Sequence, residues 1–244
     1  FASQLRELFG LTLPGKEPGS LIPKLAAFWE AIGTINPAAV GIAAAASNVK
    51  KELLDQGCRE LESLGFKTQY RPHITSSFRY FAGTRERRLG EFLEMLKSPD
   101  IDAIFCARGG YGSGQLIPNI DADVIRENAK IVNGASDITF LLNLMERSGV
   151  VSFHGPMVAT SIREGVAGYD RSVLLDLLQG KKAVRFPTAG TSILRPGSGE
   201  GRLVGGCLSI VVATLGTKHE IDTDDAILIL EDLDTKPYQI DRMI

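Results

Sequence analysis

The sequence has few cysteines, little net charge and no long apolar segment. Its three cysteines, Cys58, Cys106 and Cys207, lie far apart and form no CxxC pair, so neither a disulfide framework nor a zinc site is expected. We expect them to be small core residues in a reducing compartment. The net charge of −2 gives no electrostatic reason to expect nucleic acid or an anionic membrane as a partner. No apolar run reaches the roughly 18 residues that a bilayer-spanning helix needs.

The composition is that of an ordinary globular protein. Apolar residues make up 44% of the 244 residues and charged residues 23%. This length suffices for one large domain or two small ones, with a sizeable core.

Apolar runs alternate with amphipathic patterns in the first two thirds of the chain. Strands are expected at 40–46, 66–70, 101–107, 129–132 and 150–153, with helices at 48–64, 84–96 and 137–147. This alternation predicts an α/β fold, with a parallel sheet and helices on both of its faces. After Pro156 we expect a helix at 171–178 and short strands at 191–194, 201–204 and 226–230, whereas 208–215 fits either a helix or a strand.

These patterns divide the chain into four parts. Residues 1–33, with a helical pattern at 21–32, are expected to form an N-terminal appendage. The parallel, helix-flanked α/β domain spans 34–160 and carries the candidate nucleophile described below. A linker helix spans 161–180, and a smaller, incomplete second domain of mixed strands spans 181–244.

Ser136 lies where an apolar strand turns into a helical pattern. Such a serine projects its hydroxyl into the crevice at the carboxyl end of a parallel sheet, where ligands bind. The first N–H groups of the helix can bind a developing oxyanion there. The segment resembles a nucleophile elbow, with Asp137 in the place of the second glycine of GxSxG. On this fragment alone, an ordinary helix N-cap is the favoured interpretation.

A glycine-rich segment, 108–114, directly follows the strand expected at 101–107. A phosphate-binding loop is one interpretation, but the segment fits neither GxxxxGK[ST] nor GxGxxG. An oxyanion or substrate loop beside Ser136 is the second interpretation. A tight turn without a chemical role is the third.

The remaining candidates are a carboxylate and three histidines. Glu231 and Asp232 follow an apolar strand, where a carboxylate could orient a catalytic histidine, lie on a solvated turn or pair with Arg242. His154 ends the fifth expected strand, at the same sheet edge as Ser136. It lines the crevice if strands four and five are neighbours, and otherwise simply closes its strand. The other two, at positions 73 and 219, are expected to be structural or solvated.

Six short segments occur in an order that resembles the LD-carboxypeptidase family of serine peptidases, which includes muramoyl-tetrapeptide carboxypeptidases and microcin-immunity hydrolases. The segments are FAGT at 81–84 with Arg87, RGGYG at 108–112, GASD at 134–137, HGP at 154–156, GGCL at 205–208, and LED at 230–232 with PYQIDRM at 237–243. The resemblance covers roughly residues 36–244 and leaves residues 1–33 outside.

The resemblance implies a site and an activity. Its members cut the amide bond to a C-terminal D-amino acid in peptidoglycan peptides, or amide bonds in peptidyl-nucleotide antibiotics, without a metal or organic cofactor. They are often homodimers and often cytoplasmic recycling enzymes. The implied residues are Ser136 as nucleophile, Glu231 of a Ser-Glu-His triad, the N–H groups of Asp137 and Gly110 as oxyanion hole, and Arg108, Gly109, Tyr111 and His154 around the substrate.

One member of the implied triad has no counterpart. The family's catalytic histidine follows the glutamate in a later segment, and the sequence ends at Ile244 before such a segment. Because the sequence also starts at Phe1 without a methionine, we expect a C-terminally truncated piece of an active enzyme. A non-catalytic muropeptide-binding protein is the alternative. A less favoured hypothesis is that His154 replaces the missing base.

Overall fold

A five-stranded parallel sheet forms the centre of the larger unit. The computed structural model describes residues 38–178 and 190–244, so the expectations for residues 1–33 lie outside the described residues. The strands are β1 (Ala39–Ala43), β2 (Lys67–Gln69), β3 (Ala103–Cys106), β4 (Ile131–Gly134) and β5 (Phe153–His154), in the order β2-β1-β3-β4-β5. Every pairing in this sheet is parallel, which confirms the predicted fold class.

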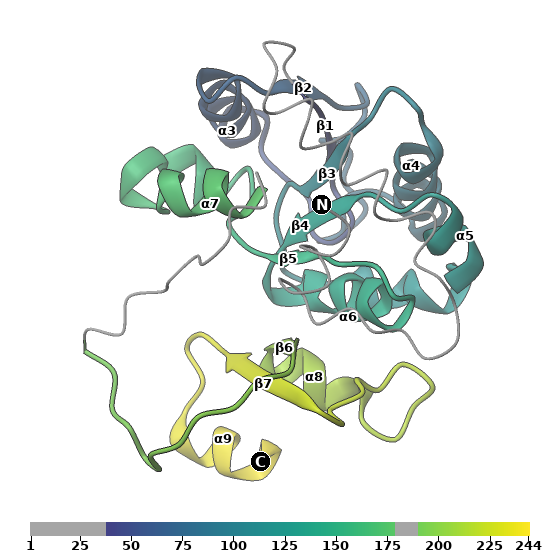
Figure 1. Ribbon diagram of the computed structural model, residues 1–244. Helices are drawn as coiled ribbons and strands as arrows, with labels where there is room; N and C mark the ends of the chain where they lie inside the picture. The colour runs from purple at the N-terminus through teal and green to yellow at the C-terminus, as the bar shows by residue number, and fades with distance from the viewer. Residues whose placement is uncertain (1–37, 179–189) are drawn as a thin grey trace.

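Helices cover both faces of the sheet (Figure 1). On one face lie α3 (Lys51–Ser63) and α7 (Arg171–Leu178), and on the other α4 (Arg85–Lys97), α5 (Ala122–Glu127) and α6 (Thr139–Arg147). Short 3-10 helices are η1 (Ser113–Gln115), η2 (Ile117–Asn119), η3 (Ser136–Ile138) and η4 (Ile162–Ala167). All four residues of β3 are buried, as expected for a strand covered on both faces.

Local chemistry sets several of the helix ends. The Thr84 side chain accepts a hydrogen bond from the N–H of Arg87, so it caps the start of α4. Gly65 has a φ of +94° directly after α3, a conformation that glycine adopts with little strain. These boundaries fall within a few residues of those that the sequence predicts.

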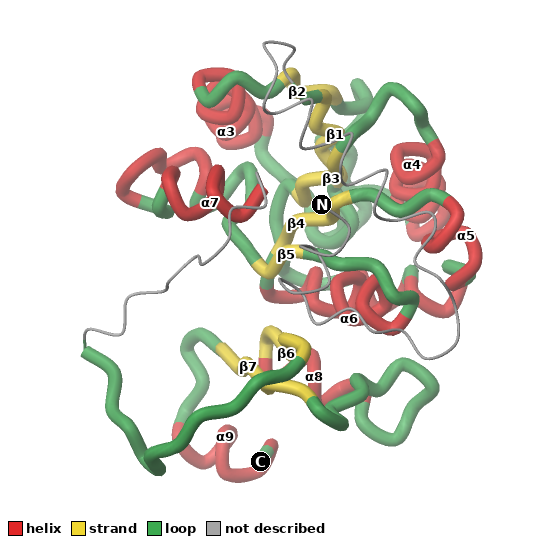
Figure 2. Tube along the Cα trace, in the orientation of Figure 1, coloured by secondary structure: helices red, strands yellow, loops and turns green. Residues whose placement is uncertain are grey.

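A second, smaller unit contains β6 (Arg202–Cys207) and β7 (Ala226–Glu231), with α8 (Leu208–Thr214) and α9 (Pro237–Met243). The two strands are parallel, and Cys207 is in register with Glu231. The prediction of a strand at Thr191–Leu194 was wrong. Figure 2 draws residues 190–201 as loop, and the side chains of Ile193 and Leu194 are 79% and 97% exposed, with no described strand to pair with.

The strand β7 is apolar in sequence and yet largely exposed. Its residues Ile227, Leu228, Ile229 and Leu230 are between 38% and 50% exposed. Such a run of β-branched and aliphatic residues favours a strand and would ordinarily be covered. Among the described residues β7 pairs on one side only, with β6. It therefore presents an open, apolar edge.

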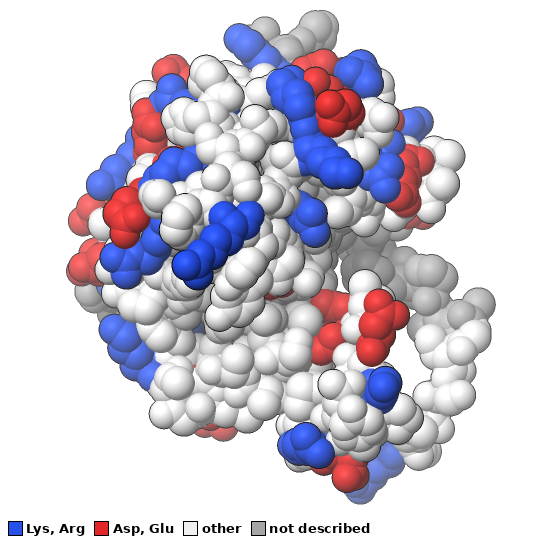
Figure 3. Space-filling model, turned by 180° about the vertical axis from the view of Figure 1, so that it is seen from behind, with Lys and Arg blue, Asp and Glu red and all other residues white. Residues whose placement is uncertain are grey.

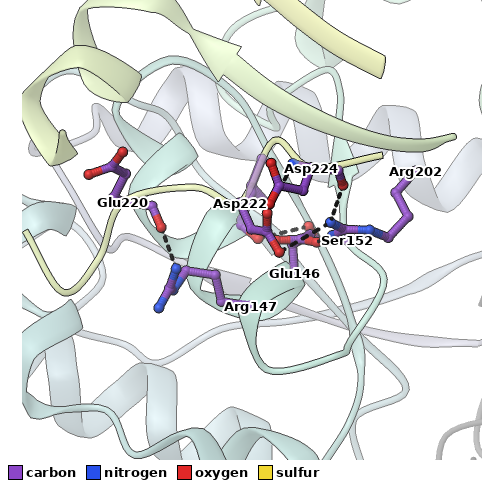
Figure 4. Close-up of polar contacts among 8 residues, drawn as sticks. Glu146, Arg147, Ser152, Arg202, Glu220, Asp222 and Asp224 are labelled. Carbon is purple, nitrogen blue, oxygen red and sulfur yellow. Dashed lines mark hydrogen bonds and ion pairs between the residues drawn. The ribbon is translucent and has the colours of Figure 1, made fainter. Parts of the chain in front are cut away.

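The two units meet along α6, which packs against β6 and α8. Figure 4 shows Arg202 of β6 at this junction, where its guanidinium pairs with Glu146 of α6. Its Nη2 also lies 3.4 Å from Asp222 Oδ2 and donates to the carbonyl of Asp224 at 3.1 Å. Arg147 donates to the carbonyl of Glu220 close by. Side chains from both units thus form one polar cluster.

On the face shown in Figure 3, basic and acidic residues are interspersed over the larger unit. Within residues 38–178 and 190–244, no helix combines the length and the apolar character that crossing a membrane requires.

Candidate active site

Ser136 occupies a sharp turn between β4 and η3. Its φ of +57° lies in the left-handed region, which non-glycine residues rarely adopt. The residue that precedes η3 is Ala135, and the Ser136 hydroxyl makes no hydrogen bond with another described residue. The N-cap interpretation of Ser136 was therefore wrong. A strained turn that presents a half-buried, unengaged hydroxyl is the geometry of a nucleophile elbow.

The glycine-rich segment lies directly against this serine. A Cβ atom on Gly109 would come within 3.0 Å of Ser136 Cβ and 3.3 Å of its Oγ. Only glycine leaves the hydroxyl its space at that position. Parallel pairing of β3 with β4 brings the two segments together, because both follow the carboxyl ends of neighbouring strands.

Ser47, which follows β1, shapes the glycine loop, defined here as Gly109–Gly112. The Ser47 N–H donates to the carbonyl of Gly109 at 3.3 Å, and its hydroxyl accepts from the N–H of Tyr111 at 3.0 Å. Between these bonds, the N–H of Gly110 makes none with a described residue, and the φ of Gly110 is +105°. One backbone donor of the loop is thus left for a ligand.

A second backbone donor lies on the serine side. The N–H of Asp137 belongs to the first turn of η3, where backbone N–H groups have no acceptor within the helix. The Asp137 side chain is 1% exposed, and its Oδ2 accepts from the N–H of Ser113 at 2.8 Å. Burial and this hydrogen bond fix the side chain of Asp137 next to Ser136, and Gly110 belongs to the loop that packs against this serine through Gly109. Paired donors of this kind can stabilise a tetrahedral oxyanion.

His154 and Glu231 meet across the two units. His154 ends β5 beside β4, in register with Gly134, and Glu231 ends β7. His154 Nε2 lies 3.3 Å from Glu231 Oε1, with the two side chains 36% and 39% exposed. The suggested pairing of Glu231 with Arg242 was wrong, since the partner of Glu231 is His154. No hydrogen bond joins His154 to Ser136, so this structure does not bring the proposed replacement base into contact with the nucleophile.

Arg108 and Tyr111 flank the glycine loop. Arg108 is half-buried, and its Nη1 donates to the carbonyl of Asn48 at 3.4 Å. The ring of Tyr111 is 56% exposed and lies 5.9 Å from the rings of both Tyr80 and Phe81. These side chains form an open rim that a ligand can reach.

Two contributors to this site escaped the sequence analysis. Ser47 follows an alanine run and carries no motif, but the strand order places it at the switch point between β1 and β3, where open sheets bind ligands. Arg88 lies beneath the glycine loop and has no sequence signal at all. Only knowledge of the strand order could have pointed to Ser47.

The cysteines provide no alternative nucleophile. Burial raises the pKa of the Cys58 thiol to about 11 and that of Cys106 to about 12. Burial also raises the pKa of Cys207. All three are buried and unpaired, so their thiols stay protonated near neutral pH. In the part of the chain that the structure describes, no group of three or more His, Cys, Asp or Glu residues is arranged to hold a metal ion.

Comparison with known families matches both units. The LD-carboxypeptidase N-terminal domain matches residues 40–155, and the LD-carboxypeptidase C-terminal domain matches residues 200–244.

Individual proteins are similar over most of the chain. A probable murein peptide carboxypeptidase of Bacillus subtilis is 38% identical over 84% of this chain and 65% of its own length. A murein tetrapeptide carboxypeptidase of Pseudomonas aeruginosa is 29% identical over 84% and 69%. The microcin C7 self-immunity protein MccF, solved in complex with aspartyl sulfamoyl adenosine, superposes with a TM-score of 0.72 at 27% identity, over 84% of this chain and 71% of that one. The chain thus spans about two thirds of the length of such relatives.

Proposed function

The chain belongs to the LD-carboxypeptidase family, and from that premise we propose that it is a serine hydrolase that cleaves the amide bond to a C-terminal D-amino acid in murein peptides. The observation that carries the proposal is the strained turn of Ser136, whose hydroxyl makes no hydrogen bond with a described residue and lies against Gly109 of the glycine loop. The N–H groups of Asp137 and Gly110, which have no described acceptor, are the proposed oxyanion donors. The names of the relatives, murein peptide and murein tetrapeptide carboxypeptidase, support the class of substrate.

The proposed reaction is acyl transfer in two steps. Ser136 Oγ attacks the carbonyl carbon of the scissile amide, and the carbonyl oxygen takes up negative charge between the N–H groups of Gly110 and Asp137. Collapse of this intermediate breaks the C–N bond, releases the protonated D-amino acid and leaves an ester on Ser136. Water then hydrolyses the ester and restores the hydroxyl.

Attack by Ser136 requires a base that accepts its hydroxyl proton. In the family resemblance this base is a histidine that follows Glu231, whereas the last histidine among the 244 residues is His219. We propose that this chain supplies the nucleophile, the oxyanion donors and the orienting glutamate. Because one triad member is missing, we expect its rate to lie several orders of magnitude below that of a complete triad.

D-Alanine release from a murein tetrapeptide tests this proposal. The 244-residue chain should release D-alanine slowly, and added imidazole should accelerate the release because it replaces the absent base. Ser136→Ala should abolish release with and without imidazole, while binding of the peptide, measured by calorimetry, persists. Release that survives Ser136→Ala would contradict the proposal.

A non-catalytic muropeptide-binding protein is the second candidate. The absence of any hydrogen bond between Ser136 Oγ and a described histidine favours it. Micromolar binding of the tetrapeptide without turnover, even in imidazole, would support this alternative. Absence of both binding and turnover would exclude both candidates.

The similarity to MccF makes a peptidyl-nucleotide amide the third candidate substrate. The same assay with an aminoacyl nucleotide amide in place of the tetrapeptide separates the two hydrolase proposals.

We also propose, on the family resemblance, that the chain forms a homodimer and acts in the cytoplasm. Sedimentation equilibrium of the purified chain tests the first of these, since a single monomeric species would contradict it.

A further inference from the structure

A buried guanidinium lies directly beneath the glycine loop. The Arg88 side chain, on α4, is 1% exposed. Nη1 donates to the carbonyls of Ala45 at 2.9 Å and Gly112 at 2.7 Å, and Nη2 donates to Gln115 Oε1 at 2.7 Å. No described carboxylate forms an ion pair with it. The acceptors are therefore two carbonyls and an amide, contributed by the segments that follow β1 and β3.

The bond to Gly112 fixes one peptide plane from both ends. The carbonyl of Gly112 accepts from Arg88, and the N–H of the same peptide unit, on Ser113, donates to Asp137 Oδ2 at 2.8 Å. Asp137 is the residue next to the nucleophile. A continuous path of hydrogen bonds thus connects Arg88 to the residue that carries one proposed oxyanion donor.

The bond to Ala45 acts on the other end of the loop. The segment after β1 runs from Ala45 to Ser47, and Ser47 bonds to the carbonyl of Gly109 and to the N–H of Tyr111. Gly110, which carries the second proposed donor, lies between these two bonds. Arg88 therefore restrains both segments that fix the direction of the Gly110 N–H.

Arginine suits this place better than any other cation. Its planar fork reaches three acceptors in different directions, whereas a lysine offers a single nitrogen. The Phe81 ring lies 4.8 Å from the guanidinium carbon and covers one face of it. A Cβ atom on Gly112 would come within 2.7 Å of Arg88 Nη1, so the loop and the side chain leave no spare room. Burial lowers the pKa of Arg88, and an arginine stays charged under such a shift.

Burying the Arg88 guanidinium costs desolvation free energy, which indicates a role beyond packing. Removing a charge from water is unfavourable unless hydrogen bonds compensate it, and an apolar side chain would fill the same space without that cost. We propose that Arg88 is a positioning residue that orients the glycine loop, so that the N–H groups of Gly110 and Asp137 converge on the substrate's carbonyl oxygen. The inference rests on the proposed hydrolase function and adds a residue to it.

Two readouts test the role of Arg88, one of which needs no activity. Arg88→Lys keeps the charge but loses the fork, Arg88→Met removes the charge, and Arg85→Met on the exposed side of the same helix is the control. We expect amide exchange at Tyr111 and Ser113 to accelerate about tenfold or more in both Arg88 variants, because their protecting bonds weaken. In the imidazole-assisted assay, kcat should fall about 100-fold, as for loss of an oxyanion donor, with KM little changed. Arg85→Met should match the wild type in both.

The outcomes separate this inference from the proposed function. A folded Arg88→Lys with wild-type exchange and wild-type kcat would overturn it, as would equal losses in kcat and in binding of the peptide. If Arg88→Met fails to fold, Arg88→Lys decides alone. If the wild type shows no turnover, the hydrolase proposal fails, and amide exchange alone then decides whether Arg88 orients the loop.

Discussion

At the scale of single residues, the backbone conformation of Ser136 lowers the stability of the fold. A non-glycine residue in the left-handed region costs about 1–2 kcal/mol relative to an ordinary turn conformation. The parallel strands and the buried Asp137 beside it hold the turn in place. The strain is the price of presenting a hydroxyl at the edge of the sheet.

Replacing this serine should separate stability from activity. Ser136→Gly should raise the free energy of unfolding by about 1 kcal/mol, because glycine adopts a positive φ with little strain, and should abolish hydrolysis. Ser136→Ala is the matched variant, since it loses the hydroxyl but keeps the strain, and its stability should stay near that of the wild type. Urea denaturation measures both. Equal stabilities for the two variants would show that the turn is not strained.

The residues that the sequence could locate are those at strand ends. Ser136, the glycine loop and His154 all follow apolar runs, and in a parallel sheet such positions share one edge. Arg88 could not be located in this way. Its three acceptors come from segments that lie 24 to 43 residues away, and two of them are backbone carbonyls, which leave no trace in the residue types.

At the scale of elements, a charged contact ties α3 to the segment that leads into α7. Arg171 Nε and Nη2 each lie 2.7 Å from the Glu60 carboxylate, and the Tyr169 hydroxyl donates to it at 2.8 Å. The hydrogen bond from Arg171 is the main reason why the pKa of Glu60 lies below its usual value, against an opposing effect of burial. This contact anchors the last described helix of the larger unit.

The contact should make stability depend on pH. A carboxyl group whose pKa is lower in the folded state stabilises that state above its unfolded pKa of about 4.3, and this contribution disappears as the pH falls through the folded value. Glu60→Gln should therefore lose about 1 kcal/mol at pH 7 and little at pH 3. Glu52→Gln, on the same helix, is the control. Urea midpoints at the two pH values measure the difference, and a loss of equal size at both would contradict the assignment.

The sequence periodicity predicted helices and strands correctly where each element has a neighbouring strand or a packed face. The alternation of runs through residue 153 predicts the five strands of the sheet, and Leu208–Thr214, which fitted two structures, is a helix that packs beside β6. The prediction failed at Thr191–Leu194, although its residues favour a strand. A strand forms only where a neighbour supplies hydrogen bonds, and that condition depends on tertiary structure.

At the scale of the whole molecule, the proposed site is divided between two units. Ser136 and His154 belong to the larger unit, and Glu231 reaches His154 from the smaller one. The cluster around Arg202 fixes the junction, with Glu146 on one side and Asp222 and Asp224 on the other. The distance between His154 and Glu231 therefore depends on contacts elsewhere along α6.

Removing the guanidinium at this junction should uncouple the two units. Arg202→Met should convert a single thermal transition into two, the earlier one belonging to the smaller unit, because Glu146 and Asp222 lose their shared cation. Arg195→Met, in the exposed loop before β6, should leave the transition unchanged. Differential scanning calorimetry distinguishes the cases. A single, unshifted transition in Arg202→Met would show that apolar packing alone joins the units.

The open edge of β7 has a consequence for how the protein behaves as it folds. Folding is a unimolecular process, whereas pairing of two such edges from different chains is bimolecular. The rate of edge pairing therefore rises with protein concentration relative to the rate of folding. Ile227 to Leu230 make that encounter favourable. The yield of native protein after dilution from urea should thus fall as the protein concentration rises. Leu228→Lys should restore this yield at high concentration.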